Sequence, residues 1–476
     1  MLLLCGKEGD SMEMSLKEQK ALRKREKILN GNLWKIAIMI SLPVVLYNLC
    51  NYMYGIYDMM IVQKANIGDA ADIVVLDQIK NMLSTLGGAL ATSGGILVAR
   101  KYGENKIPEA RKCANAFFSL ALIVAGFILI FIPIGVPFLK LLNTDQTIID
   151  NSLGYYNVQI ITLLITTMNS TFIALEKAKG NTFHLFCLNI GVIVIKISLT
   201  TLFAFGPFEG VTVTWLALAT LIAQGFMFIC GMYLCFRNGN ILRIRFKELN
   251  FNRIDCKTLI IVAIPVFIDG FLFNYGKVYI NGVATTVYGL TCVGALGISN
   301  TMAGLLSTII SSFKEGGSAI VSQNYGNENG RRIINFYKVN FVYILTISLI
   351  GTIVLYLLKS PIALFFSPDD PVQQTMIINI FKWECLDIIF MGFTGIAMTL
   401  FYGFGKTRLT MALSLCTLFL YRIPILLFLI YVVKMDYEAC GIAMFASNML
   451  SGTVSLIASL CFLKYIKRNH KYSNLF

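Results

Sequence analysis

Long apolar runs separated by short polar segments dominate this sequence from residue 34 onward. A helix needs about 20 mostly apolar residues to cross a membrane, and twelve of the runs reach that length. They lack the alternation of apolar and polar residues that marks the strands of an outer-membrane barrel. The twelve predicted spans cover residues 34–63, 73–99, 113–138, 153–176, 183–206, 210–236, 258–288, 292–322, 335–358, 375–402, 407–434 and 439–466. The pattern therefore predicts an all-α membrane protein with twelve transmembrane helices.

The composition agrees with this prediction and excludes several classes of protein. Of the 476 residues, 56% are apolar and only 14% are charged, whereas soluble domains carry about 25% charged residues. The chain is therefore neither a water-soluble globule nor a disordered chain. Two histidines, and 12 cysteines without a CxxC pair, leave little material for a metal site or a catalytic triad. No phosphate-binding GxxxxGK(S/T) pattern occurs, so we expect no cofactor and an ion or substrate gradient as the energy source.

The basic residues are distributed unevenly along the chain. The 40 Lys and Arg outnumber the 26 Asp and Glu, for a formal net charge of +14. When successive spans alternate in direction, 30 of the 40 basic residues fall on one side, together with both termini. Loops rich in Lys and Arg stay in the cytoplasm. We therefore predict a multi-pass protein of the cell's inner (plasma) membrane with both termini cytoplasmic. The asymmetry also explains the net charge without a nucleic-acid partner.

The two halves of the chain repeat one another. Residues 94–105 resemble residues 316–327 at an offset of 222 to 223, and Pro43 matches Pro265 at 222. Parallel repeats of this kind are typical of secondary transporters that bind substrate between two lobes. The predicted parts are a cytoplasmic N-terminal segment (1–33), an N-lobe of spans 1–6 (34–236), a cytoplasmic linker (237–257), a C-lobe of spans 7–12 (258–466) and a cytoplasmic tail (467–476).

Several motifs in this order resemble one transporter family. They are Ser41-Leu42-Pro43 and residues 57–62 in span 1, residues 321–326 closing span 8, residues 397–407 closing span 10, and residues 421–424 in span 11. Over almost the whole chain, the sequence resembles the multidrug and toxin extrusion (MATE) family of cation-coupled antiporters. This family belongs to the multidrug/oligosaccharidyl-lipid/polysaccharide exporter superfamily. The resemblance implies two six-helix lobes forming a V around a central cleft, which opens alternately inward and outward.

Asp58 is the first ionisable residue within a predicted span. On a helix, Asn51 and Asp58 fall about 20° apart and Tyr54 about 40° from Asp58, so the three form a polar stripe. A carboxylate taken out of water can hold a proton near neutral pH, and neighbouring oxygens would let it bind Na⁺. An aspartate of this span-1 motif is a coupling-cation site in the family, so the resemblance implies that role for Asp58. Na⁺ at this site is the only metal we expect.

The duplication places a second stripe in span 7. At an offset of 223, its residues are Asn274, Lys277 and Asn281, so the acid is lost and a lysine is gained. We hypothesise that Lys277 pairs with Asp269 or Asp387, or faces the cleft and attracts anionic substrate groups. The alternative is a lysine that merely reaches for the membrane surface.

Three further charges belong to the predicted C-lobe. Acids of this lobe bind cations in part of the family, so the resemblance makes Asp387 a possible cation or substrate site. Glu384 lies three residues earlier, and we expect it to be solvated at the membrane interface. Arg422 in span 11 matches a family arginine, and we expect it to bond helix ends within the C-lobe.

Span 5 departs from the family pattern. Many members carry an aspartate there, but this chain has Thr200 at that position, with Lys196 one turn earlier. We hypothesise that Lys196 forms an ion pair with Asp58 in the empty state and competes with the coupling cation.

The sequence therefore predicts a secondary active multidrug efflux antiporter. It would act as a monomer in the lipid bilayer, exporting organic, cationic or amphipathic small molecules in exchange for H⁺ or Na⁺. One alternative is a lipid-linked saccharide or lipid flippase of the same superfamily, with Lys196, Lys277 and Arg422 as basic residues of its cavity. A polytopic membrane enzyme acting on lipids is a further alternative, and it would need clustered acids or histidines at the membrane surface.

Overall fold

The computed structural model describes residues 16–65, 70–141, 146–206, 212–249, 253–368 and 370–468. Twelve helices in this part of the chain are long and apolar enough to cross a membrane, which confirms the predicted number. All regular structure in the described ranges is helical. The predicted N-terminal segment and tail lie partly outside the described residues.

The helices follow one another with short connections. The first half contains α1 (Leu16–Asn30), α2 (Leu33–Ala65), α3 (Ala70–Gly103), α4 (Ile107–Leu129), α5 (Gly135–Leu141), α6 (Gln146–Ala178), α7 (Thr182–Phe205) and α8 (Val213–Phe236). The second half contains η1 (Phe246–Glu248), α9 (Arg253–Tyr288), α10 (Leu290–Gly326), α11 (Gly330–Phe366), α12 (Pro371–Gly403), α13 (Thr407–Leu415), η2 (Cys416–Arg422), α14 (Ile423–Leu427), η3 (Phe428–Val432) and α15 (Glu438–Arg468). The π-helical segments η2 and η3 continue α13 and α14 as one spanning rod.

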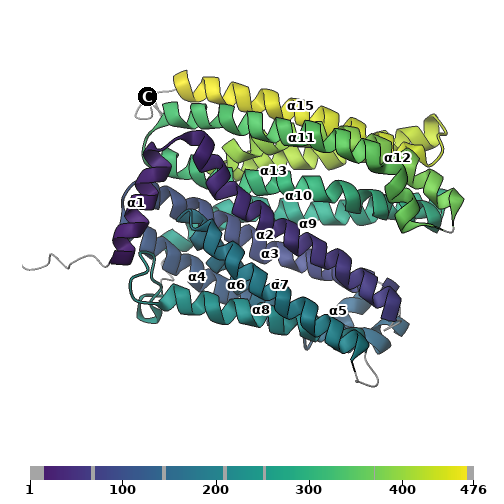
Figure 1. Cartoon of the computed structure of the whole chain (residues 1–476), viewed down its shortest axis with the longest axis horizontal. Helices are drawn as coiled ribbons and strands as arrows, with labels where there is room; N and C mark the ends of the chain where they lie inside the picture. The colour runs from purple at the N-terminus through teal and green to yellow at the C-terminus, as the bar shows by residue number, and fades with distance from the viewer. Residues whose placement is uncertain are drawn as a thin grey trace, which may run out of the picture.

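Two lobes form a V. Helices α2 to α8 make the N-lobe and α9 to α15 make the C-lobe, and the lobes spread apart away from the end where α1 lies (Figure 1). Helix α2 packs against α7 of its own lobe and against α10 of the other. Pro43 in α2 and Pro265 in α9 occupy equivalent places in the two lobes. The first helix of each lobe thus lacks one backbone hydrogen bond at the same point.

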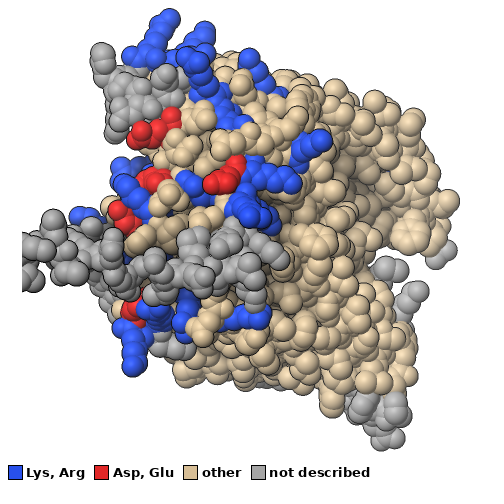
Figure 2. Space-filling view, turned by 60° about the vertical axis from the view of Figure 1, so that its left-hand side comes forward, with Lys and Arg blue, Asp and Glu red and all other residues tan. Residues whose placement is uncertain are grey.

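Positive charge gathers at the closed end of the V. Lys and Arg cover the end of the molecule at which α1 lies, whereas the remainder of the face seen in Figure 2 is almost free of charge. We call it the basic end. A belt without charge is what a lipid-facing surface requires, since ionised side chains are costly in hydrocarbon.

Span 3 ends earlier than predicted. The sequence predicted a helix to residue 138, but α4 ends at Leu129 and the short α5 begins at Gly135. Between them, the amides of residues 130–132 bond carbonyls three residues back rather than four. Pro133 has no amide hydrogen, and its ring blocks a continued α-helix. An apolar run alone does not reveal such a break.

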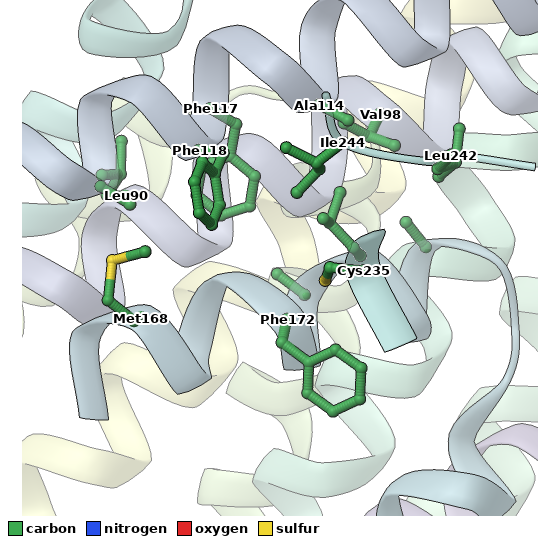
Figure 3. Close-up of a cluster of buried hydrophobic side chains, with 14 of the residues drawn as sticks. Leu90, Val98, Ala114, Phe117, Phe118, Met168, Phe172, Cys235, Leu242 and Ile244 are labelled. Carbon is green, nitrogen blue, oxygen red and sulfur yellow. The ribbon is translucent and has the colours of Figure 1, made fainter. Parts of the chain in front are cut away.

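The N-lobe core is built from aromatic side chains of α4 and α6. Phe117, Phe118 and Phe172 belong to the buried cluster drawn in Figure 3, and all three are at most 2% exposed. Leu242 and Ile244 of the linker are buried in the same cluster. The segment after α8 is therefore packed against the N-lobe rather than hanging between the lobes.

Removing the Phe172 ring is expected to destabilise the N-lobe. Phe172 is fully buried and contacts the backbone of α8 at Gly231, so Phe172→Ala leaves a cavity that costs about 3–5 kcal/mol. Thermal unfolding of the purified protein in detergent should show a clearly lower midpoint. The control is Phe183→Ala, because Phe183 is 60% exposed. Equal midpoints for the two variants would contradict this account of the core.

Candidate functional site

An ion pair joins α2 to α7 inside the N-lobe. The Lys196 ammonium lies 3.0 Å from Oδ2 of Asp58. It also donates to the Thr220 hydroxyl at 2.6 Å and to the Leu216 carbonyl at 3.1 Å, both on α8. The Lys196 side chain is 2% exposed and that of Asp58 is 26% exposed. The predicted contact between these two residues is therefore present, and three oxygens surround the buried ammonium.

The remaining residues of the predicted stripe have a different neighbour. The Asn51 side chain hydrogen-bonds Tyr47, one turn earlier on α2, and Tyr54 lies near the same phenol. Asn51 and Tyr54 are both half-buried. Thr200, which stands where many family members carry an acid, is fully buried one turn beyond Lys196. The structure thus brings a lysine, rather than a second acid, to Asp58.

A second group of charges is buried in the C-lobe. Asp387 of α12 accepts a hydrogen bond from Asn448 of α15 at 2.8 Å. The Arg422 guanidinium donates to Oδ1 of Asn448 at 2.7 Å and to Ser447 at 3.0 Å. Arg422 also lies within electrostatic range of Asp387 and Glu384. It therefore bonds the interior of α15 rather than helix ends, and it balances the buried acids.

The expectation of a solvated Glu384 is wrong. Glu384 is 1% exposed and Asp387 is 2% exposed. Helix α12 begins at Pro371, so Glu384 lies about 20 Å along it, well inside the lobe. Both carboxylate oxygens of Glu384 are buried without a hydrogen-bond partner among the described residues. A buried carboxylate of this kind is costly.

The second stripe, on α9, does not make the pairings proposed for it. Asp269 is hydrogen-bonded to Ser414 and lies near Lys314, while Asp387 is bonded to Asn448. Lys277 is exposed, and its ammonium lies 5.0 Å from the centre of the Phe273 ring. It lies within electrostatic range of Arg422 and Glu384. Its neighbours on the stripe, Asn274 and Asn281, are half-buried.

A cavity of about 340 Å³ lies between the lobes. Helices α2, α3 and α6 of the N-lobe and α10 and α12 of the C-lobe surround it. Its lining includes aromatic, amide and charged side chains: Tyr47, Asn48, Lys177, Lys314, Glu315 and Tyr402. The volume falls in the range of about 300–1,000 Å³ that is usual for small-molecule pockets.

An ion pair crosses this cavity from lobe to lobe. Lys177 of α6 lies 2.6 Å from Oε2 of Glu315 on α10. The amide of Asn48 bonds the Ser312 hydroxyl at 2.9 Å, one turn away. Glu315 was not among the site residues predicted from the sequence, although the charged pair Lys314-Glu315 interrupts the apolar run of span 8.

Two glycines seal the basic end. A Cβ on Gly103 would overlap the Gln323 carbonyl, and one on Gly326 would overlap the Arg100 carbonyl. Gly103 and Gly326 are equivalent positions of the duplication, so α3 and α10 meet backbone to backbone. The Gln323 side chain also donates to the carbonyl of Ala178 at 2.6 Å. Only glycine permits such an approach.

Helix α1 lies across this seal and contacts both lobes. The Arg25 guanidinium donates to the carbonyls of Tyr102 and Gly103 at 2.8 and 2.7 Å. From the C-lobe, Arg332 donates to the carbonyls of Ile28 and Gly31 at 3.0 and 2.6 Å. The lobes are thus held together at the basic end and apart at the other.

Comparisons with known proteins place these features in context. The MatE family model matches residues 43–202 and 265–428. These two matches begin 222 residues apart, the offset of the duplication. No curated protein matches the sequence significantly.

Thirty-six chains of solved structures match the fold. One is described as the outward-facing conformation of a multidrug resistance MATE family transporter of the MOP superfamily. Its TM-score is 0.87 at 16% identity, over 93% of this chain and 98% of that one. A MOP superfamily transporter from Pyrococcus furiosus, described as having a binding pocket of reverse polarity, has the same values. A MATE structure in the bent conformation matches with a TM-score of 0.85, at 16% identity, over 96% and 99%.

A side chain at Gly326 is expected to open the basic end. Gly326→Val places a branched side chain against the Arg100 carbonyl, so α3 and α10 have to separate. In a cysteine-free background, nitroxide labels at the exposed positions 105 and 327 would report this by pulsed electron resonance as a shift to longer distances. Gly282→Val is the matched control, because nothing lies within 4 Å of a Cβ there. Unchanged distances in Gly326→Val would refute the glycine seal.

Proposed function

Because the chain belongs to the MatE family of membrane transporters, we propose that it is a secondary active antiporter of organic compounds. It exports cationic or amphipathic small molecules in exchange for H⁺ or Na⁺, as a monomer whose two lobes enclose the substrate cavity. The observation that carries this proposal is the Lys196–Asp58 ion pair. Asp58 lies within a membrane-spanning helix, and a coupling cation can take the place of the Lys196 ammonium as its partner.

The orientation in the membrane follows from the basic end. Lys and Arg mark the cytoplasmic side, so the basic end faces the cytoplasm. The structure, sealed there, then corresponds to an outward-open state. In this state, the coupling cation enters from outside, and substrate leaves to the outside.

Coupling takes place at Asp58. A proton neutralises the carboxylate, or Na⁺ binds its oxygens, and in either case Asp58 no longer attracts Lys196. The ammonium then retains only the Thr220 and Leu216 oxygens of α8. The contact between α2 and α7 weakens, and the lobes rearrange toward the inward-open state. A cation drives such a change only by binding one state better than the other.

A C-lobe cation site at Asp387 is a second part of this proposal. Glu384 and Asp387 bring two buried carboxylates to one face of α12, with one guanidinium beside them. A proton or a Na⁺ bound there would satisfy oxygens that are otherwise buried without partners. The basic residues proposed for the flippase alternative do not serve it, because Arg422 and Lys196 are buried beside acids and do not line the inter-lobe cavity. The two lysines that do line the cavity, Lys177 and Lys314, leave that alternative to experiment.

Replacing Asp58 is expected to abolish coupled export. Asp58→Asn keeps the size of the side chain but removes the charge that attracts a cation. In everted vesicles with an imposed pH or Na⁺ gradient, ethidium transport should fall by about tenfold or more. The control is Glu328→Gln, an exposed acid at the basic end. Full transport by Asp58→Asn at normal expression would rule out this coupling site. Gradient-independent movement of lipid probes alone would favour the flippase.

A further inference from the structure

Glu315 is an acid that the coupling scheme does not use. It lies in the interior of α10, yet 41% of its side chain is exposed, because it opens into the inter-lobe cavity. The amide of Asn48 hydrogen-bonds it, and the phenols of Tyr47 and Tyr402 lie close to its charge. A carboxylate flanked by aromatic rings is suited to binding a cation.

The protein's own lysines make the contacts that an organic cation would make. Lys177 pairs with Glu315 at 2.6 Å, and its ammonium lies 5.9 Å from the centre of the Tyr47 ring. Lys314 lies 5.8 Å from the centre of the Tyr402 ring. Ring centres within about 6 Å of a cation attract it through the quadrupole of the ring. The cavity is therefore already a cation site, and the cations in it are the side chains of Lys177 and Lys314.

The two members of the ion pair belong to different lobes. Lys177 comes from α6 of the N-lobe, whereas Glu315 and Tyr402 both come from the C-lobe. Separation of the lobes at the basic end withdraws Lys177 and leaves Glu315 and Tyr402 together. Lys314 moves with Glu315 in the C-lobe, and its charge lies within range of both Glu315 and Asp269, but it makes no ion pair with Glu315 among the described residues. Glu315 then loses its direct ion-pair partner, in a cavity open at the basic end.

We propose that Glu315, with the ring of Tyr402 beside it, binds the positively charged group of an organic cation when the lobes separate at the basic end. Closure of the lobes returns Lys177 to Glu315 and displaces that group toward the open side. The inference rests on the proposed export function and adds to it a substrate site and a release step. The same ion pair that closes the cavity thus expels its occupant.

The test is direct binding of tetraphenylphosphonium, a cation with no hydrogen-bond donors, to the purified protein in detergent. Lys177→Met removes the internal competitor and should strengthen binding by about tenfold. Glu315→Gln should weaken binding by about tenfold in the same assay. Lys177→Arg keeps the charge and should bind as the wild type does. Glu109→Gln is the control acid, since Glu109 lies at the basic end outside the inter-lobe cavity.

The outcomes separate this inference from the proposed function. Equal binding by the wild type and Lys177→Met, or undiminished binding by Glu315→Gln, overturns the site. If Glu315→Gln still exports ethidium under an imposed gradient, the site is wrong while the antiporter stands. If neither the wild type nor Lys177→Met binds or transports an organic cation, both proposals fail. Because Lys177→Met is predicted to gain binding, a misfolded variant does not imitate the expected result.

Discussion

The need to neutralise charge within a low-dielectric membrane organises this protein. Each ionised group inside the lobes carries a large solvation cost unless an opposite charge or several oxygens replace water. Here the compensation links helices: Lys196 joins Asp58 across α2 and α7, Arg422 joins the acids of α12 to α15, and Lys177 joins Glu315 across the cavity. Because each pair spans two elements, changing one charge changes how those elements pack. In the proposed mechanism, neutralisation of a charge and conformational change are therefore the same event.

The contact between α3 and α10 at the basic end is the feature of the fold that these charges can open or close. Gly103 and Gly326 let α3 and α10 touch through their backbones, and α1 bonds both lobes over that contact. Such a contact is either made or broken, since close-packed backbones do not deform gradually. The binding proposed at Asp58 and at Glu315 would act on helices that begin or end near this seal. A local exchange of cations can thus select between two arrangements of whole lobes.

Much of the fold was predictable from the sequence, and less of the site. Apolar runs and the 222-residue repeat indicated twelve spans in two lobes, because length and periodicity are properties of the chain itself. The pairing of Lys196 with Asp58 was a hypothesis, and the structure contains it, whereas the pairing of Lys277 with Asp269 or Asp387 is not made. The burial of Glu384, the early end of α4 and the role of Glu315 did not follow. The first and the last depend on where α12 begins and which lobe lies opposite, and periodicity carries no information on either. The end of α4 is marked by Pro133, which a count of apolar residues does not register.

In the proposed mechanism, Lys196 and the coupling cation compete for Asp58. Carbodiimides modify protonated carboxyl groups, so labelling of Asp58, located by mass spectrometry, reports which partner the carboxyl has. The account predicts little labelling in the wild type at neutral pH and strong labelling in Lys196→Met, since removing the ammonium lets the carboxyl take up a proton. If Na⁺ is the coupling ion, it should suppress that labelling. Equal labelling of Asp58 in the two proteins would contradict the account.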